Sequence, residues 1–554
     1  MNKPLLISRT FMVFELLLIV AVATVPLLFD YNYRINIFLS WEGAYRLYQG
    51  QIPYRDFGLP LGFGYWLIPT LFFFLFGPFM TSLIKAQVFI NIASGLIFRG
   101  ILHTLDIRPQ VRFLAVLTFC LSYMLLNFWP WYNHSVIVFQ LAGLYFLLRH
   151  MLKQPSFANL AGAAFFLFLS FFTKQDAGAM GLLIALALLL YHSIANRQIG
   201  SLFFFLVFYV GIACLFILPF YNSGFTYWFN YGQLPHYSRV ALPDFINEFM
   251  MGAKWEKFYL LAVLLILINR FIEAPKWKEV FFNQPFMVSV LLTAGILVEA
   301  VLFQVTSYVP PDNHIFFHSF ALAFAFTYLN IGTYLNRFVP FATATLMVTL
   351  FWGNYYWRQV GDKVLAYLPQ KKPAAGYTEN IISRNTYIVP DPMEDSLGKA
   401  AAEWQVVKGY RSFEKMKMHP STIAGINRLM QLPMVQEKNK RLRVLNMTEL
   451  TPLAYEMPYE PEKNVPLWHH LGVGMFNKQV DEYCRKIQQQ QYDIALFEAI
   501  PKLNNFYPWA VRRCLQQHYV RIDSFPGPRQ SQVSYIEVYV RPSPDNSVKP
   551  PVTD

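Results

Sequence analysis

Acidic and basic side chains are concentrated in one short polar segment, residues 41–62, that lies between two long apolar runs. The segment contains Glu42, Arg46, Arg55 and Asp56. A carboxylate can take the proton of an attacking hydroxyl or amine group, and a guanidinium can stabilise the charge of a leaving phosphate. Because apolar runs bound the segment, these groups would meet at the edge of a bilayer. The segment therefore predicts chemistry on a lipid-borne substrate.

The composition is that of a polytopic membrane protein. The chain has 554 residues, of which 55% are hydrophobic and 14% are charged, and apolar runs long enough to cross a bilayer recur from Phe11 to Trp357. Trp and Tyr gather at the ends of runs, as at 129–132 and 355–357, where they would anchor in the membrane interfaces. The formal charge of +13 comes mostly from loop Lys and Arg and from a basic C-terminal part, so it needs no nucleic-acid partner.

Twelve apolar stretches are candidates for membrane helices. They cover residues 11–29, 61–79, 83–105, 113–129, 133–151, 157–173, 177–192, 200–220, 256–272, 286–306, 315–334 and 338–357. The positive-inside rule places the basic connectors in the cytoplasm, which works only if one early stretch does not cross. The best candidate is 61–79, which Gly and Pro interrupt and which has no basic cluster at its end. We expect it to pack on the outer leaflet as a juxtamembrane or re-entrant helix, which leaves about eleven spans.

This topology brings the acidic and histidine-bearing loops to the outer face. Besides the first loop, they include Asn133 and His134, Lys174 to Asp176, and Asp312 to His314. The inner loops are short and basic. The sequence therefore predicts a site on the outer side, next to lipid.

The composition becomes polar and Pro-rich after Trp357. We therefore expect a transmembrane helical domain over 1–357 and an extracytoplasmic linker with a small α/β domain over 358–554, so that the fold is mainly α. Short strands are predicted at 443–447, 493–498, 519–525 and 533–540, and helices at 477–490 and 507–517. Cys484 and Cys514 lie in this part and could pair in an oxidising compartment. We expect the domain to orient an acceptor or to cover the site, with Glu456, Glu460 and Glu462 as solvated loop charges.

The segment Trp-Glu-Gly-Ala-Tyr-Arg-Leu-Tyr-Gln-Gly-Gln-Ile-Pro-Tyr-Arg-Asp-Phe at 41–57, with the apolar segment that follows to Gly77, resembles the first outer loop of the GT-C glycosyltransferases. In that pattern an acidic pair is followed, three residues after its Glu, by a Tyr, and then by a Gly, a Pro-Tyr-Arg-Asp-like turn and a juxtamembrane helix. Glu42 and Tyr45 keep this spacing, and Gly50 and residues 53–56 supply the rest. The match covers about 40 residues.

The resemblance implies a multi-pass enzyme of the bacterial inner membrane with a GT-C fold. Such an enzyme moves a sugar from a polyprenyl-phosphate donor to a glycan, lipid or protein acceptor on the outer face, with inversion. The sequence departs from the pattern at two positions. Trp41 occupies the first acidic position, and Asn133 stands where several relatives carry an Asp. Either Glu42 or Asp56 alone is then the base, or the acceptor chemistry differs.

Each candidate residue has a structural alternative. Glu42 and Asp56 are the candidate catalytic bases, but they could simply pair with Arg46 and Arg55 in a solvated loop. The candidates for binding the donor phosphate are Arg55, Lys174 and Arg239. Lys174 could equally be a lysine that snorkels to the interface. The other site candidates are Tyr45, Tyr54, Asn133, His134, Asp176 and His314.

No metal ligands are assigned from the sequence. His314 and His318 have a spacing that could place both on one helix face. A divalent ion is used by some members of the superfamily, but their acidic metal-binding motifs are not matched, so a divalent metal stays open. Glu299 lies inside an apolar run and must face protein or water, as a functional residue or in a hydrogen bond between helices.

Two other classes of function compete with an enzyme. A transporter or lipid flippase would also have about eleven spans and a buried acid, but we find no inverted repeat and no matching pair of interrupted helices. A non-catalytic scaffold would use the outer α/β domain to bind partners. The sequence has no phosphate-cradling Gly-rich loop followed by Lys and Ser or Thr, so an ATP-driven role is not predicted.

Overall fold

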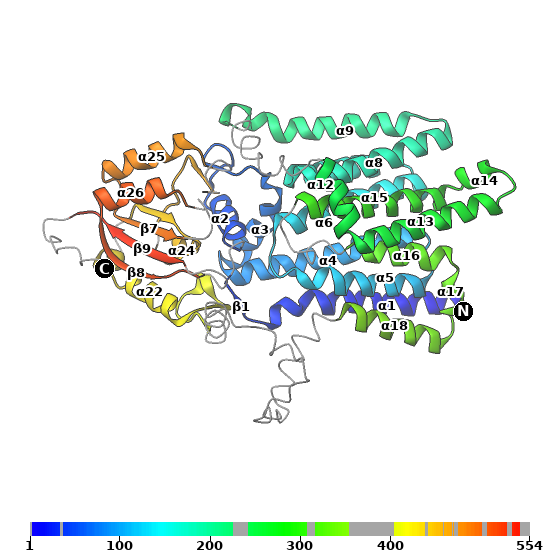
Figure 1. The fold of residues 1–554 in the computed structure, drawn as a ribbon, viewed down its shortest axis with the longest axis horizontal. Coiled ribbons are helices and arrows are strands. Elements are labelled where there is room, and N and C mark those ends of the chain that lie inside the picture. The colour runs from blue at the N-terminus through cyan, green and yellow to red at the C-terminus, as the bar shows by residue number, and fades with distance from the viewer. Residues whose placement is uncertain are drawn as a thin grey trace, which may run out of the picture.

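The computed structural model describes residues 3–33, 37–224, 242–306, 316–353, 404–437, 441–457, 459–467, 469, 475–500, 507–528 and 534–542. These residues form a helical bundle and a smaller α/β part, which Figure 1 shows at the right and the left. Residues that the sequence analysis singled out at 225–241 and 307–315, among them Arg239 and His314, lie outside the described residues.

The bundle consists of apolar helices that overlap the predicted stretches. They are α1 (Lys3–Thr24), α4 (Met80–Thr104), α5 (Pro109–Ser122), α6 (Tyr132–Leu152), α7 (Phe157–Thr173), α8 (Gln175–Asn196), α9 (Gly200–Ile217), α13 (Lys254–Glu273), α15 (Gln284–Thr306), α16 (Phe317–Tyr328) and α18 (Phe338–Trp352). The short helices α12 (Leu242–Asn247), α14 (Trp277–Phe281) and α17 (Ile331–Tyr334) lie in the connections. Among the described residues, 6 helices are long and apolar enough to cross a membrane. The chain is a multi-pass membrane protein, as predicted.

A buried ion cluster ties the first helix to its neighbours. Glu15 on α1 is fully buried. Its carboxylate accepts hydrogen bonds from Arg99 Nε of α4 at 2.7 Å and from Arg112 Nε of α5 at 2.9 Å. A buried carboxylate is tolerated only when such partners replace its hydration. The acid in the first apolar run is therefore a structural one that joins three helices.

The predicted juxtamembrane stretch contains only a short α-helix. After a turn at Phe63–Trp66, α3 (Leu67–Phe76) has 10 residues, which extend over roughly 15 Å, about half of the hydrocarbon core. It ends at Gly77, whose φ of 89° is a conformation that favours glycine. In Figure 1, α3 lies with α2 (Ile37–Tyr48) where the bundle meets the α/β part. The short α3 agrees with the expectation of a juxtamembrane helix, and the statement that 61–79 does not cross the membrane stays a prediction.

The α/β part is built on a four-stranded sheet with the order β5-β7-β9-β8. Its strands are β5 (Val444–Met447), β7 (Ile494–Ala499), β8 (Val520–Pro526) and β9 (Tyr535–Val540), close to the predicted ranges. β5 and β7 are parallel, and the other pairs are antiparallel. Helices α25 (Asn477–Gln488) and α26 (Trp509–His518) lie on one side and α22 (Pro420–Met430) on the other (Figure 1). The short helices α23 (Pro433–Gln436) and α24 (Leu453–Glu456) complete this part.

Two small sheets join the α/β part to the outer loop. β1 (Tyr31–Asn32) runs parallel to β4 (Met416–Met418), which also pairs with β3 (Gln405–Val406). β2 (Phe57–Gly58) runs parallel to β6 (Val465–Pro466). Two short strands of the N-terminal part, β1 and β2, therefore pair with strands of the C-terminal part, so the first outer loop and the α/β part form one structural unit.

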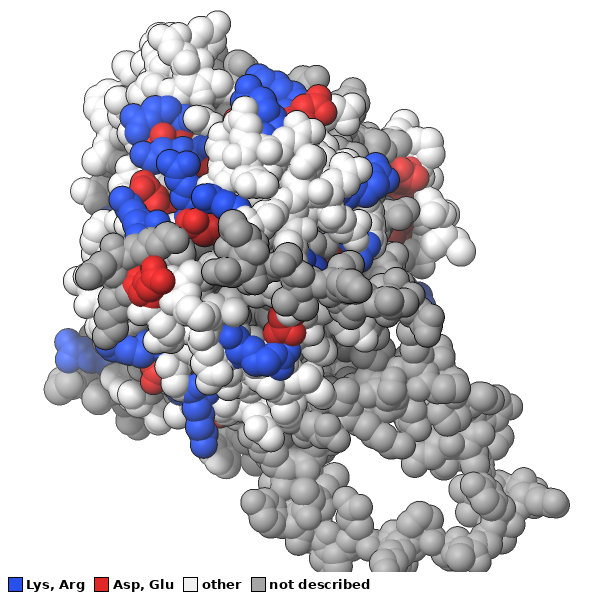
Figure 2. Space-filling view, turned by 90° about the vertical axis from the view of Figure 1, so that its left-hand side faces the viewer, with Lys and Arg blue, Asp and Glu red and all other residues white. Residues whose placement is uncertain are grey.

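Positive and negative side chains alternate at the end of the α/β part that lies away from the bundle. Figure 2, which looks onto this end, shows basic and acidic side chains next to one another. The ion pairs of this part include Arg428 with Asp523 at 2.8 Å and Arg512 with Glu537 at 2.6 Å. On the face drawn, the positive charge does not form a single continuous stripe.

Candidate functional site

Glu42 lies on α2 beside a small cavity between the outer loop and the α/β part. The cavity has a volume of about 40 Å³, enough for about three water molecules. The outer loop contributes α2 residues to its wall, and the α/β part contributes polar and aromatic side chains. The wall includes Trp41, Glu42, Tyr45, Arg46, Asn446, Thr451, Tyr459, Glu462, His469 and Tyr483.

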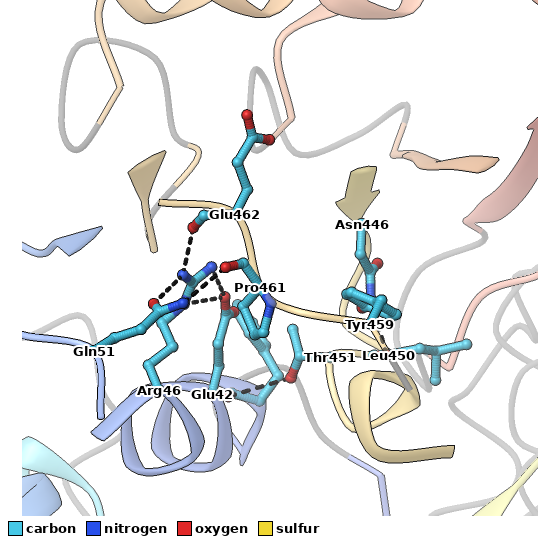
Figure 3. A network of polar contacts seen from close by, with 10 residues as sticks. Glu42, Arg46, Gln51, Asn446, Leu450, Thr451, Tyr459, Pro461 and Glu462 are labelled. Carbon is cyan, nitrogen blue, oxygen red and sulfur yellow. Dashed lines mark hydrogen bonds and ion pairs between the residues drawn. The ribbon is translucent and has the colours of Figure 1, made fainter. Parts of the chain in front are cut away.

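The carboxylate of Glu42 is paired on one oxygen. Arg46 donates from Nε at 3.0 Å and from Nη2 at 2.8 Å, both to Oε1 of Glu42. Among the described residues, no hydrogen bond reaches Oε2. Arg46 also donates to Gln51 Oε1 at 2.9 Å and to the Glu462 carbonyl at 2.7 Å (Figure 3). The Arg46 guanidinium is thus bonded both to the first outer loop and to the α/β part, at the junction between the two.

Burial decides the electrostatics of Glu42. Its side chain is 13% exposed and that of Arg46 is 6% exposed, so the expected alternative of a solvated loop pair is wrong for this pair. Desolvation raises the pKa of Glu42 above its ordinary value, although the Arg46 charge and its hydrogen bonds act in the opposite direction. A carboxyl with a raised pKa is a stronger proton acceptor when it is ionised.

The C-terminal part supplies more of this site than the sequence suggested. Glu462 was expected to be a solvated loop charge, which is wrong, because its carboxylate binds Lys486 Nζ at 2.6 Å and Tyr492 Oη at 2.8 Å. The pairing of β6 with β2 holds this segment against the outer loop. Glu456 likewise accepts a hydrogen bond from the Ser412 amide at 2.7 Å. Glu460 is half exposed, as expected of a loop charge.

His469, which follows β6, lines the cavity. Burial lowers the pKa of His469 to about 3, with a smaller effect from the charge of Arg46. The imidazole is therefore neutral at neutral pH and carries no charge to the cavity wall.

Asp56 closes a turn and does not line the cavity. It accepts hydrogen bonds from Arg55 Nε at 3.0 Å, from Arg55 Nη2 at 2.8 Å and from the Ile52 amide at 2.8 Å. The Arg55 hydrogen bonds hold the pKa of Asp56 below its usual range. Within the same turn Tyr54 has a φ of 64° and donates from Oη to the Leu61 carbonyl at 3.0 Å. A carboxylate with these bonds suits a structural role better than that of a base.

Two further outer-loop predictions have clear positions. Tyr45 is buried, lines the cavity, and its ring stacks on that of Trp41 with centroids 4.4 Å apart. Trp41 is fully buried and donates from Nε1 to the Pro78 carbonyl at 3.0 Å. The side chain of Arg55 is 52% exposed on the surface beside Asp56. The candidate residues of this loop therefore fall into two places. Glu42 and Tyr45 line the cavity, whereas Arg55 and Asp56 lie in a turn at the surface.

Lys174 lies in a second buried group, at the junction of α7 and α8. Its side chain is 3% exposed, and Nζ lies 3.1 Å from Oδ2 of Asp176 and 4.3 Å from the centroid of the Phe303 ring on α15. The alternative of a lysine that snorkels to the interface is wrong, because the ammonium group points into the protein. The buried lysine is a local positive charge at the predicted outer end of the bundle.

Asn133 and His134 lie in the first turn of α6, which packs against the end of α7, where Ser170 Oγ donates to the Val136 carbonyl at 2.9 Å. Asn133 is 1% exposed and His134 is 5% exposed, and the His134 carbonyl accepts a hydrogen bond from Tyr123 Oη at 2.9 Å. Further along α6, Gln140 Nε2 donates to Glu299 Oε2 at 2.5 Å. The interhelical hydrogen bond expected for Glu299 is therefore present.

The described ranges hold no group of three His, Cys, Asp or Glu residues that could bind a metal. His318 is buried, its Nδ1 lies 3.0 Å from Tyr259 Oη, and its ring packs 4.0 Å from that of Trp352. His314 lies outside the described residues, so the pair of His314 and His318 stays a prediction.

Comparison with solved structures identifies the fold. The chain is similar to ArnT from Cupriavidus metallidurans in the apo state, with 13% sequence identity, a TM-score of 0.50, and coverage of 95% of this chain and 98% of that one. The chain has the GT-C fold.

Other solved structures with a GT-C fold match over long ranges. ArnT from Cupriavidus metallidurans bound to undecaprenyl phosphate matches with 12% identity and a TM-score of 0.46, over 96% of this chain and 97% of that one. An oligosaccharyltransferase from Archaeoglobus fulgidus in complex with Zn and sulfate matches with 10% identity and a TM-score of 0.44, over 87% of this chain and 68% of that one. No family model matches the sequence, and no curated protein matches it.

Within the GT-C fold, some residues near the two groups were not found from the sequence. Tyr459 and Tyr483 come from the distant α/β part, and no local pattern links them to Glu42. Gln140 could have been found, because an amide inside an apolar run follows the same rule that singled out Glu299.

Proposed function

We propose that this protein is an integral membrane glycosyltransferase that moves a sugar from a polyprenyl-phosphate donor to an acceptor at the outer face of the cytoplasmic membrane. The observation that carries the proposal is Glu42, a largely buried carboxylate with one oxygen bonded to Arg46 and a cavity beside it, on the first outer loop of a GT-C fold. The resemblance of residues 41–77 to the first outer loop of these transferases supports the same reaction.

Glu42 is the general base in the proposed reaction. The acceptor's hydroxyl or amine attacks the anomeric carbon of the donor, and its proton passes to the Glu42 carboxylate, directly or through one water molecule in the cavity. The bond between the anomeric carbon and the phosphate oxygen breaks, and polyprenyl phosphate leaves with that electron pair. A single displacement of this kind inverts the anomeric configuration.

Lys174 is the proposed partner of the phosphate. An ammonium group stabilises the negative charge that develops on the leaving phosphate oxygens, and a buried one does so more strongly than a solvated one. Asp176 forms an ion pair with this lysine, so the donor phosphate would compete with the Asp176 carboxylate for the ammonium group.

A donor panel tests the class of reaction. Purified protein in lipid nanodiscs is incubated with membrane extract as the acceptor source and with decaprenyl phosphate carrying mannose, glucose, N-acetylglucosamine or arabinofuranose. We expect release of decaprenyl phosphate from at least one of these donors and no release of nucleotide from UDP- or GDP-sugars. Turnover of a nucleotide sugar, or no turnover of any lipid-linked sugar, would contradict the proposal.

We further propose that the first outer loop and the α/β part lie outside the cytoplasm. The Cys484–Cys514 disulfide between α25 and α26 favours this orientation, because such bonds persist in oxidising compartments. Lys463→Cys in the α/β part and Arg197→Cys after α8 provide two reporter sites. A membrane-impermeant maleimide should label the Cys at 463 in intact cells and the Cys at 197 only after lysis. The reverse pattern would overturn the orientation.

A further inference from the structure

Besides Nε2 of Gln175, which is a donor, four buried oxygen atoms on the helices beside Lys174 have no hydrogen-bond partner among the described residues. They are Oδ1 of Asn133, Oε1 of Gln140, Oγ1 of Thr173 and Oε1 of Glu299. Each of these side chains is at most 1% exposed. A buried polar atom without a partner destabilises the fold, because it has lost its hydration and gained no hydrogen bond, and native proteins contain few such atoms. Several in one region indicate partners that come from outside the chain.

The contacts of these residues place them in one neighbourhood. Asn133 and Gln140 are seven positions apart on α6, which puts them on one helix face about 10 Å apart. Gln140 contacts Glu299 directly. One helical turn beyond Glu299 on α15, the Phe303 ring contacts Lys174. Thr173 immediately precedes Lys174, and Ser170 one turn earlier on α7 donates to the Val136 carbonyl of α6 at 2.9 Å, so the four atoms lie on the helices that pack beside the buried lysine.

The chemistry of these atoms fits hydroxyl groups. Amide oxygens, a carboxyl oxygen and a threonine hydroxyl all accept hydrogen bonds, and the hydroxyl groups of a sugar can donate to each of them. A phosphate offers mostly acceptors, which these oxygens would repel. A metal cation would be disfavoured by the ammonium group of Lys174 in the same place.

We propose that Asn133, Gln140 and Glu299 form the subsite that binds the hydroxyl groups of the donor's sugar. The inference rests on the proposed function, in which Lys174 binds the donor phosphate. Because the sugar is bonded directly to that phosphate, its hydroxyl groups must lie within a few ångströms of the lysine. The unpartnered oxygens then accept hydrogen bonds from the hydroxyl groups of the sugar.

Asn133→Ala provides the cleanest test, because Oδ1 of Asn133 has no partner in the described structure and its removal breaks no hydrogen bond of that atom. Gln140→Leu is a second variant that tests the deeper end of the subsite. Gln110→Leu is the matched control, since Gln110 is a buried glutamine that binds Asn336, on helix α5 at the predicted cytoplasmic end.

The measurement is the dissociation constant of each protein in nanodiscs for decaprenyl phosphate and for the four sugar-bearing donors of the panel. We expect wild-type protein and Gln110→Leu to bind at least one sugar-bearing donor more tightly than decaprenyl phosphate. Asn133→Ala and Gln140→Leu should each lose about tenfold of that affinity and bind decaprenyl phosphate as wild-type protein does.

Three results would overturn the subsite, and they differ from one another. If both variants keep the full preference for the sugar-bearing donor, the subsite is wrong while the proposed function stands. If wild-type protein gains nothing from any sugar, or if the region instead takes up a divalent cation that competes with the donor, the oxygens serve another ligand. If wild-type protein binds no decaprenyl phosphate at all, the proposed function itself fails.

Discussion

Glu42→Gln is expected to slow sugar transfer by about 10²- to 10⁴-fold, the range by which a general base accelerates a reaction. The amide keeps the shape of the side chain and can still accept a hydrogen bond from Arg46, but it cannot take the acceptor's proton. The dissociation constant for the donor should stay close to that of the wild-type protein. The measurement is single-turnover release of decaprenyl phosphate, with donor binding measured in parallel.

Glu460→Gln is the matched control for this variant. Glu460 is half exposed in the same junction and pairs with Arg441 at 2.9 Å, so the loss of its charge should leave the rate within about twofold of wild type. If Glu42→Gln retains wild-type turnover, Glu42 is not the base. If both variants lose activity equally, the charge of the whole junction matters more than one carboxylate.

The pH dependence gives a second readout of Glu42. Its pKa is raised by burial, so the carboxylate form that accepts the proton is lost as pH falls through a value above the ordinary 4.5. We expect the wild-type rate to rise with pH through that value and then to level off. The residual rate of Glu42→Gln should lack this rise, whereas Asp56→Asn, at a carboxyl whose pKa is lowered, should keep it.

Lys174→Met is expected to weaken binding of decaprenyl phosphate and to slow transfer by about 10²- to 10³-fold, as is usual when one charged donor to a developing anion is removed. Methionine fills a similar volume without the charge. However, the variant also leaves the Asp176 carboxylate buried without its 3.1 Å ammonium partner, which can destabilise the fold by about 3–5 kcal/mol.

The double variant Lys174→Met/Asp176→Asn separates these two effects. It removes both charges together, so thermal stability should return toward that of wild type while phosphate binding should not. Lys153→Met is the control, because Lys153 pairs with Asp106 on an exposed loop that the topology places in the cytoplasm. A double variant that binds decaprenyl phosphate like wild type would mean that Lys174 has only a structural role.

The bundle could be predicted from the sequence because each of its helices lies in one long, predominantly apolar run. The ten-residue α3 was also predictable, since Gly and Pro divide the stretch 61–79. The four strands of the main sheet followed from alternating or apolar short runs, such as the one that forms β9, whereas the short strands β3, β4 and β6 were not predicted. These features are local, so a sequence pattern contains them.

The candidate site was predictable only in part, because its walls come from distant segments. Residue type and spacing made Glu42 and Lys174 candidates, but they did not predict the burial of these side chains or the separation of Asp56 from the cavity. The pairing of β2 with β6 brings Phe57 next to Val465. No sequence pattern in either segment predicts that contact. This pairing places Glu462, which we expected to be a solvated loop charge, in the wall of the cavity.

The most direct test of the account is transfer of a radiolabelled sugar from its decaprenyl-phosphate donor to acceptor by purified protein in nanodiscs, with wild type and Glu42→Gln side by side. The account predicts that wild-type protein releases decaprenyl phosphate and labels the acceptor in equal amounts, and that Glu42→Gln binds the donor but does neither at a comparable rate. Equal turnover by the two proteins, or labelled acceptor without release of decaprenyl phosphate, would contradict it.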